Sequence, residues 1–270
     1  MFLYFIAETF ISQYLLSMSS DKTIKPLLYG HRGLSTLAPE NTLPSFQLCL
    51  EHNISGIELD VHICKTGECV VVHDSNLLRV SGENCLVEKL SLDEIKQLDV
   101  GSHKNASFKG TTIPLLQEVF ELCGKNIMYD IELKPSFFND KALCKATYKI
   151  IKDYKMEYNS SISSFSPLAL KNMEKIGHWT FQDAIIFSHE KHVPFFLRNG
   201  FGKHLCSCTY LKPEFKQINE KFMENAKQDK YKVVSWVVDD LKDAKKMVNF
   251  GVDGVISNNP LLLKKTGLFR

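Results

Sequence analysis

Short apolar and β-branched runs alternate with segments of helical periodicity along almost the whole chain, from Pro26 onward. Strands that alternate with helices are typical of βαβ units, which build a parallel sheet. Eight runs are expected to be strands: Leu27–His31, Gly56–His62, Cys69–His73, Ile127–Leu133, Ser160–Phe165, Ala184–Ser188, Lys232–Val238 and Asp253–Ser257. Helical spacing is found at about 41–52, 114–123, 139–155, 166–176, 190–198, 213–228, 240–249 and 259–266. Eight such units in 270 residues predict an α/β fold, a single (β/α)8 TIM barrel.

Two segments between the predicted strands need a separate interpretation. Leu205–Cys208 looks extended, but Pro213 soon opens a helical pattern, so we interpret this stretch as a connection rather than a ninth strand. Residues 74–113, after the third strand, are too long for a plain loop and predict a short insertion that borders the site. Within the insertion, Ser91 followed by Glu94 forms a capping box, which predicts a short helix.

The doubly wound open sheet is the alternative architecture for alternating strands and helices. It predicts a glycine-rich turn after the first strand and ligand binding at one switch point. In this chain polar residues instead follow several strands, which is typical of a barrel whose site gathers at the carboxyl ends of its strands. We therefore predict the barrel.

One shift in composition, near the amino terminus, sets the domain organisation. Residues 26–270 are expected to form the barrel, and residues 1–25 a dispensable apolar extension. Met1–Leu16 has no basic residue before its apolar run, contains Glu8 and is shorter than the ~20 residues of a membrane span, so it fits neither a signal peptide nor a transmembrane helix. A cytoplasmic location is expected, with a peripheral membrane contact through this segment as the less favoured alternative. Met18, before a polar run, is an alternative start.

The charge balance argues against one large class of partner. The chain has 33 Lys and Arg and 31 Asp and Glu residues, scattered along the sequence, for a formal net charge of +2. No broad basic surface is expected, so nucleic acid is not predicted as a partner, whereas a small phosphorylated substrate needs only a local positive centre. The eight cysteines show no paired CxxC spacing and are interpreted as reduced thiols.

Carboxylates recur at alternate positions of two predicted strands. Glu58 and Asp60 are two residues apart, so both side chains project to one face of their strand, and Glu132 repeats the pattern in another strand. A strand-end pair facing solvent or a lysine is the alternative, but carboxylates directed into a barrel need a cation to offset their burial. The oxygen-rich set predicts a site for Mg2+ or Ca2+ rather than structural zinc. Asp130 shares the face of Glu132 and stays unassigned.

Two histidines end predicted strands. His31 ends the first strand and His73 the third, and both strands are expected to point the same way. Such a pair can act as general acid and general base across one phosphate, although a lone histidine is more often structural. Arg32, between two glycines, offers a planar donor fork for phosphate oxygens, and Lys134 offers a second cation whose alternative role is a surface charge.

Short motifs recur along the chain at a characteristic spacing. They are Gly30-His31-Arg32-Gly33, Ala38-Pro39-Glu40-Asn41-Thr42, Ser45-Phe46, Ile57-Glu58-Leu59-Asp60-Val61, Val71-Val72-His73-Asp74, Glu132-Leu133-Lys134, Ser164-Phe165, Ser235-Trp236-Val237-Val238 and the run from Gly251 to Pro260. Together they resemble the glycerophosphodiester phosphodiesterase family, almost from end to end.

The resemblance implies a role for each matching residue. His31 and His73 match the family's catalytic pair. Glu58, Asp60 and Glu132 match its metal ligands, and Arg32 and Lys134 its phosphate contacts. Glu40 matches an active-site glutamate and Trp236 a pocket aromatic, for which core packing is the alternative.

The chain departs from the family pattern at two places. Cys64-Lys65-Thr66-Gly67 stands where a Thr-Lys-Asp-Gly turn is usual, and Trp236-Val237-Val238-Asp239 stands where Trp-Thr-Val-Asn is usual. The first change alters a turn rather than a ligand. The second puts the alcohol preference in question more than the reaction.

The resemblance also implies a reaction. A divalent metal would support hydrolysis of a glycerophosphodiester, such as glycerophosphocholine or glycerophosphoethanolamine, to glycerol 3-phosphate and an alcohol. A lysophospholipase D acting on lysophospholipids at a membrane surface is the alternative within the same fold. A metabolite-binding module without catalysis is the alternative from another class, but the chain retains every residue that the reaction needs.

Overall fold

A computed structural model describes residues 25–136, 140–177, 182–191 and 193–270. The predicted extension, residues 1–25, lies outside the described residues except for its last residue. No helix among the described residues is long and apolar enough to cross a membrane.

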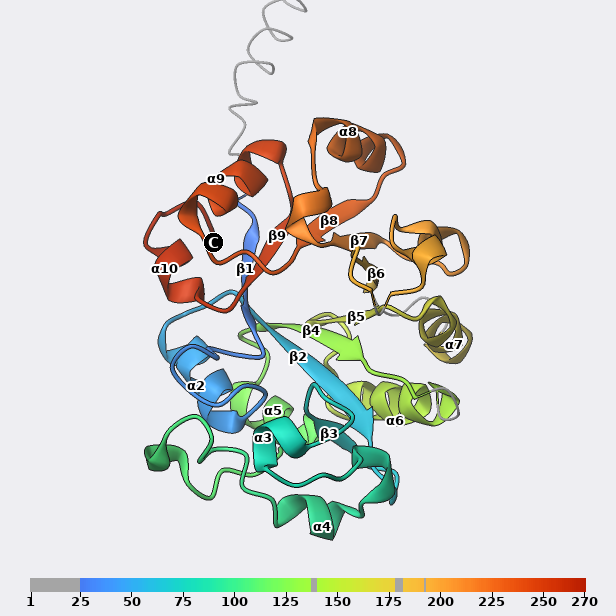
Figure 1. Ribbon diagram of the computed structural model, residues 1–270. Coiled ribbons are helices and arrows are strands. Elements are labelled where there is room, and N and C mark those ends of the chain that lie inside the picture. The colour runs from blue at the N-terminus through green and yellow to red at the C-terminus, as the bar shows by residue number, and fades with distance from the viewer. Residues whose placement is uncertain (1–24, 137–139, 178–181, 192) are drawn as a thin grey trace, which may run out of the picture.

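Eight parallel strands close into a barrel, because the first strand pairs with both the second and the last (Figure 1). In order around the barrel they are β1 (Leu27–His31), β2 (Gly56–Ile63), β4 (Met128–Leu133), β5 (Ser160–Ser164), β6 (Gln182–Phe187), β7 (Tyr210–Pro213), β8 (Lys232–Ser235) and β9 (Gly254–Ser257). The predicted (β/α)8 barrel is confirmed.

Helices surround the strands on the outside of the barrel. They are α2 (Leu43–Glu51), α5 (Leu116–Cys123), α6 (Asp140–Asp153), α7 (Pro167–Gly177), α8 (Glu220–Gln228), α9 (Leu241–Phe250) and α10 (Pro260–Lys264). Each has an apolar stripe that packs on the sheet, as helical periodicity requires. All eight cysteines are free thiols, as expected.

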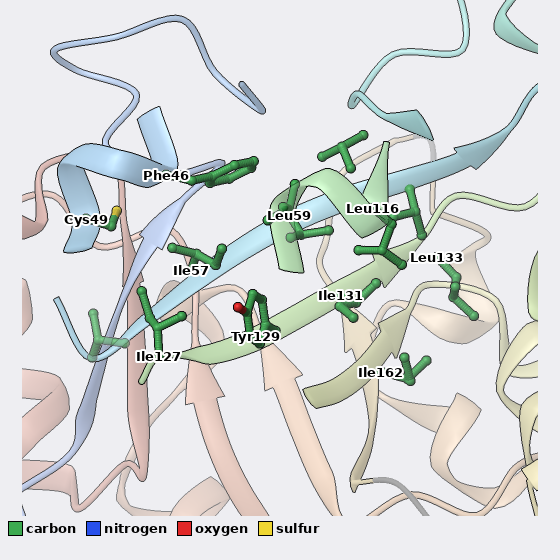
Figure 2. Close-up of a cluster of buried hydrophobic side chains, with 14 of the residues drawn as sticks. Phe46, Cys49, Ile57, Leu59, Leu116, Ile127, Tyr129, Ile131, Leu133 and Ile162 are labelled. Carbon is green, nitrogen blue, oxygen red and sulfur yellow. The ribbon is translucent and has the colours of Figure 1, made fainter. Parts of the chain in front are cut away.

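The two faces of β2 separate the core from the site. Ile57, Leu59 and Val61 are fully buried in the core outside the strand. Figure 2 shows Ile57 and Leu59 beside Phe46 of α2 and Leu116 of α5. Glu58 and Asp60, at the alternate positions, point into the barrel. Burial of the apolar face fixes the position of the strand. The strand in turn holds two carboxylates inside the barrel, although their desolvation is unfavourable.

The third predicted strand is where the sequence interpretation was wrong. β3 (Cys69–Val71) pairs antiparallel with β2, outside the ring of eight. The cause is the tight turn from Cys64 to Gly67, closed by a hydrogen bond of 3.1 Å from the Gly67 N–H to the Cys64 carbonyl. A parallel neighbour would need a crossover of a dozen or more residues. The chain therefore turns straight back, and His73 follows a returning strand rather than ending a parallel one.

The insertion that follows β3 has a small core of its own, formed by residues such as Leu77, Val87 and Ile95. Its elements are α3 (Leu78–Ser81), η1 (Val87–Lys89), α4 (Leu92–Lys96) and η2 (Ala106–Phe108), where η denotes a 3-10 helix. The predicted capping box is present, because the Ser91 hydroxyl accepts from the Glu94 N–H at the start of α4.

The barrel's missing strand lies mostly in residues 210–212, for which no element was predicted, between the connection expected at Leu205–Cys208 and the helix expected from Pro213. β7 includes Lys212 and ends at Pro213. A charged residue and a proline within four residues do not match the pattern of a buried strand, so this strand was not predicted. Leu205–Cys208 is not a strand, as expected, but β7 follows it directly.

The predicted helix at 190–198 is also wrong. The segment between β6 and β7 forms the 3-10 turns η3 (Phe195–Leu197) and η4 (Phe201–His204) instead. Pro194 lacks the N–H that an α-helix needs in its interior, and Gly200 has a φ of +77°. These two residues break the helical pattern.

Candidate active site

Strand register brings the predicted polar residues into adjacent positions inside the barrel. His31 of β1 is paired with Glu58 of β2, and Asp60 of β2 with Glu132 of β4. Parallel neighbours at the same register point to the same side of the sheet. The carboxyl ends of three strands thus gather one histidine and three carboxylates at one mouth of the barrel.

The three carboxylates form a compact cluster. One oxygen from each of Glu58, Asp60 and Glu132 lies within 4.8 Å of the others, and all three residues are buried. Apart from the ammonium of Lys134, Asp60 Oδ1 and Glu132 Oε1 have no hydrogen-bond partner among the described residues. Three buried carboxylates that share one lysine leave oxygen atoms available to a hard divalent cation, so the residues present fit Mg2+ or Ca2+.

Two basic side chains form ion pairs with the carboxylates of this cluster. Lys134 Nζ lies 3.1 Å from Asp60 Oδ1 and 2.5 Å from Glu132 Oε1, and Arg32 Nε lies 3.4 Å from Asp60 Oδ2. Burial alone would raise the pKa of Asp60, but Lys134 and Arg32 hold that pKa well below its usual value. Burial, with the charges of Asp60 and Glu132, raises the pKa of Glu58 well above its usual value.

The turn after β1 aims the backbone at the cluster. Arg32 has a φ of +56°, a left-handed conformation, and its N–H donates to Glu58 Oε2 at 3.0 Å. Gly33 also has a positive φ of +80°, and a Cβ there would lie 2.4 Å from Ser45 Oγ. Only glycine fits so close to α2, which explains why the motif needs glycine beside Arg32.

Hydrogen bonds fix the orientation of His31. Its Nδ1 lies 2.6 Å from Asn258 Oδ1, and Asn258 Nδ2 donates to Asp239 Oδ2 at 2.8 Å. Because Asp239 accepts from the amide nitrogen, the amide oxygen must face His31, whose Nδ1 then carries the proton. Nε2 is left toward the site, 3.8 Å from Glu58 Oε2. Burial, and to a lesser degree the charge of Arg32, lowers the pKa of His31 to about 4.

His73, which follows β3, is held in a similar way. Its Nδ1 lies 2.6 Å from Asp74 Oδ1, so its Nε2 is also the nitrogen left for other partners. The antiparallel course of β3 accounts for this position, because the chain returns along β2 and the Val72 N–H donates to the Asp60 carbonyl. The two histidines reach one site from strands that run in opposite directions.

Arg79, from α3 of the insertion, joins the two halves of this polar network. Its Nε donates to Asp74 Oδ2 at 2.6 Å, and its two terminal nitrogens donate to the Glu40 carboxylate at 2.9 and 2.7 Å. Glu40 also accepts from Arg32 at 2.8 Å. A continuous chain of charged hydrogen bonds thus runs from Arg32 to His73. Burial would raise the pKa of Glu40, but Arg79 and Arg32 lower it to about 2.

A pocket of about 1210 Å³ opens above the cluster. Its polar wall includes His31, Arg32, Glu58, His73, Glu132 and Lys134, and its apolar wall includes Phe165, Ile186, Pro194, Leu197 and Trp236. Trp236 is anchored, since its Nε1 donates to the Lys212 carbonyl at 2.8 Å and Phe165 packs edge-on against its ring. Glu40 stands behind Arg32 and Arg79 rather than in the wall.

A buried ion pair lies at the base of this pocket. Lys212 Nζ is 2.6 Å from Asp130 Oδ2 and 2.9 Å from Ser163 Oγ, which donates to Asp130 Oδ1 at 2.8 Å. Lys212 and Asp130 are each 2% exposed. Asp130, which the sequence left unassigned, is therefore paired with a lysine on the opposite side of the barrel.

The sequence of residues 31–262 matches the glycerophosphoryl diester phosphodiesterase family. The chain belongs to this family. It is therefore an enzyme, a phosphodiester hydrolase that acts on a small-molecule substrate, and the resemblance drawn from the motifs is confirmed.

Three relatives show how far the similarity to the phosphodiesterases extends. A glycerophosphodiester phosphodiesterase of Caldanaerobacter subterraneus subsp. tengcongensis is 32% identical over 238 residues, 88% of this chain and 96% of the relative. A phosphodiesterase of Oleispira antarctica, solved with the product sn-glycerol 3-phosphate, is 29% identical with a TM-score of 0.81, covering 89% of this chain and 96% of the other. A lysophospholipase D of Mus musculus is 36% identical over 136 residues, 48% of this chain and 42% of the relative.

Some residues of this phosphodiesterase site were not found from the sequence. Arg79 lies in the insertion, and nothing in its local pattern indicates that it reaches back to Glu40. Lys212 was not predicted because the strand that contains it, β7, was not predicted. Asn258 was inside a motif that carried the resemblance, and Asp239 stood at a departure from the family pattern, so their polarity near strand ends was the signal available. All nine predicted site residues lie in or directly behind the pocket.

Proposed function

We propose that the chain hydrolyses glycerophosphodiesters, such as glycerophosphocholine or glycerophosphoethanolamine, to glycerol 3-phosphate and the free alcohol, with a divalent cation held by Glu58, Asp60 and Glu132. One observation carries the proposal. Two imidazoles that are held through Nδ1 and that line one pocket accompany a compact cluster of three buried carboxylates. That combination offers charge stabilisation and two proton-transfer groups at one phosphate.

The basic residues supply the phosphate contacts in this proposal. Arg32 and Lys134 both line the pocket, and both have charged partners that keep them extended toward the cluster. A bound cation would neutralise the carboxylates and stabilise negative charge on the phosphoryl oxygens. Arg32 and Lys134 would then be free to contact phosphate oxygens of the substrate.

His31 and His73 divide the proton transfers in this proposal. One accepts a proton from the attacking oxygen, and the other gives a proton to the departing alkoxide. Asn258 and Asp74 hold the two rings by Nδ1, so both reactions use Nε2.

Removal of metal tests the proposal directly. After exhaustive chelation the chain should lose turnover of glycerophosphocholine, and Mg2+ or Ca2+ should restore it. Glu58→Gln, Asp60→Asn and Glu132→Gln should each weaken binding of the added ion, measured by calorimetry, while the fold is retained. Glu68→Gln, in the exposed turn before β3, is the matched control and should bind the ion as the parent does. Full turnover by a protein that elemental analysis finds free of metal would overturn the proposed cofactor.

A second candidate function is favoured by the apolar wall of the pocket. The pocket volume of about 1210 Å³ exceeds the roughly 300–1,000 Å³ that is usual for small-ligand sites. Phe165, Ile186 and Leu197 line one side of the pocket. A lysophospholipase D would use that wall for the acyl chain of its substrate. The mouse relative is named a lysophospholipase D. Turnover of glycerophosphocholine and of lysophosphatidylcholine at equal concentration separates the two candidates.

A further inference from the structure

Exposed large apolar side chains concentrate on the start of α7 and on the β6–β7 connection, whose first turn borders the mouth of the pocket. Five of the eleven in the described part of the chain belong to the start of α7 and to the β6–β7 connection: Leu168, Phe195, Phe196, Phe201 and Leu205. We refer to these five residues as the apolar rim. Phe195 is 79% exposed, and Phe196 and Phe201 are each 51% exposed. Single exposed leucines are ordinary on a protein surface, but three exposed phenylalanines within seven residues are not.

The rim is continuous with the apolar wall of the site. Pro194 and Leu197, on either side of Phe195 and Phe196, both line the pocket. The four residues of η3 and its N-cap therefore present Pro194 and Leu197 to the pocket and Phe195 and Phe196 to solvent. The two segments that carry the rim are also close together, because a Cβ on Gly202 of η4 would lie 3.1 Å from Pro167 Cγ at the start of α7.

The charge around the rim is positive. Residues 189–205 contain three basic residues, Lys191, Arg198 and Lys203, and one acidic residue, Glu190, which gives a net charge of +2. The whole chain has the same net charge, so the rest of the sequence sums to zero. Lys203 lies 3.2 Å from Asp229, so with Asp229 counted the local charge falls to +1, carried by Lys191 and Arg198 against Glu190. Exposed aromatic rings with basic residues nearby match the interface of an anionic bilayer.

We propose that the apolar rim docks the mouth of the barrel onto a lipid bilayer. The pocket would then face phosphodiester head groups at the membrane surface. The orientation rests on the second candidate of the proposed function, because a lysophospholipid carries its phosphodiester head group at a membrane surface, whereas glycerophosphocholine has no acyl chain and is soluble. Contact through the rim does not require catalysis, so the surface can be tested separately from the reaction.

Vesicle binding by the full chain tests the proposal. The triple variant Phe195→Ser, Phe196→Ser, Phe201→Ser is compared with Tyr158→Ser, which removes a 94% exposed ring from the loop before β5, at the opposite end of the barrel. The probe is a vesicle of phosphatidylcholine with phosphatidylglycerol, and the readout is the fraction that cosediments. We expect the triple variant to lose about tenfold or more in partitioning, because three rings would no longer leave water. The control should bind like the parent.

Hydrolysis of soluble glycerophosphocholine checks that the variants fold. None of the three phenylalanines lines the pocket, so the triple variant should retain the kcat/KM of the parent. Should the triple variant fail this check, Phe195→Ser alone should lose about twofold to fivefold in vesicle partitioning with kcat/KM intact.

Three results would overturn the rim as a membrane surface. They are no vesicle binding by the parent, equal binding by parent and variant, or self-association of the parent that the variant abolishes. Vesicle binding that depends on the rim, in a chain that does not hydrolyse glycerophosphocholine, would instead reject the proposed function and keep the rim.

Discussion

The two walls of the pocket differ in how the sequence encodes them. On the wall built by β1, β2 and β4, nearly every inward side chain is charged or a histidine and is held by at least one polar partner. On the wall built by β5 and by the connection between β6 and β7, the lining is mainly apolar and is held by packing. The polar wall has the groups needed for phosphate chemistry, and the apolar wall offers shape.

The largest difference between the walls should appear when the histidines are removed. His31→Ala and His73→Ala should each lower kcat for glycerophosphocholine by about 100- to 10,000-fold, because each removes a proton-transfer group, and metal content should stay near that of the parent. Removing both should cost less than the product of the two effects. Steady-state kinetics together with elemental analysis makes the measurement.

A substrate that needs no protonation of its leaving group refines this test. A p-nitrophenyl phosphodiester should rescue one histidine variant and not the other, which identifies the acid. The control is His52→Ala, at the end of α2 and away from the pocket. Near-parent rates in both variants on glycerophosphocholine would assign the histidines to structure alone.

The buried pair between Lys212 and Asp130 ties the two walls together, and breaking it should affect stability. Lys212→Met leaves Asp130 buried without its cation, which typically costs about 3–5 kcal/mol of unfolding free energy. The double variant Lys212→Met, Asp130→Asn should recover much of that loss, because no charge is left unpaired. Urea unfolding of the single and double variants gives the comparison. Equal loss in both would mean that the lysine stabilises the fold mainly by packing.

The sequence predicted the polar wall better than the apolar wall for a physical reason. Buried carboxylates such as Glu58 and Asp60 are costly without a cation, so their recurrence inside a strand is informative by itself. Ile186 or Leu197 in a pocket wall looks the same as in any core. β7 was missed because Lys212 interrupts its apolar pattern, although the charge is offset by Asp130 across the barrel.

The partners of the site residues were harder to predict than the residues themselves. Arg79 reaches Glu40 across 39 positions, and this contact exists only because β3 turns back and carries α3 over the mouth. The direction of β3 was the decisive error. The turn at Cys64 to Gly67 was visible in the sequence and was too short for the parallel strand assigned after it.

Arg79 should have a moderate effect, because it touches Glu40 and Asp74 and positions His73 and Arg32 through them. Arg79→Gln should lower kcat/KM by about tenfold. Arg79→Lys should recover only part of the lost kcat/KM, since one ammonium cannot replace a guanidinium that donates to two carboxylates. The pH profile should also change, because Asp74 would hold His73 less firmly. Lys89→Gln, an exposed change in the same insertion, is the control. A uniform loss of folded protein with an unchanged profile would reduce Arg79 to a structural role.

The smallest expected effect comes from Asp183, at the amino end of β6 and thus at the end of the barrel opposite the site. Burial, with the nearby charge of Glu174, raises the pKa of Asp183 to about 7. In the unfolded chain the carboxyl titrates near its ordinary value of about 3.9, so between these two pH values the folded state holds the extra proton. Stability contributed by this group is therefore lost as pH rises from about 4 toward 7.

Asp183→Asn removes that titration without changing the size of the side chain. At pH 8 the variant should unfold with a free energy about 1 kcal/mol higher than the parent, and the difference should shrink toward pH 4, where both chains are uncharged at this position. Thermal unfolding across this pH range measures it, and turnover of glycerophosphocholine should not change. A constant difference at all pH values would show that hydrogen bonding rather than charge sets the effect. A loss of turnover would mean that the two ends of the barrel are coupled, so that the apolar side contributes more than shape to the site.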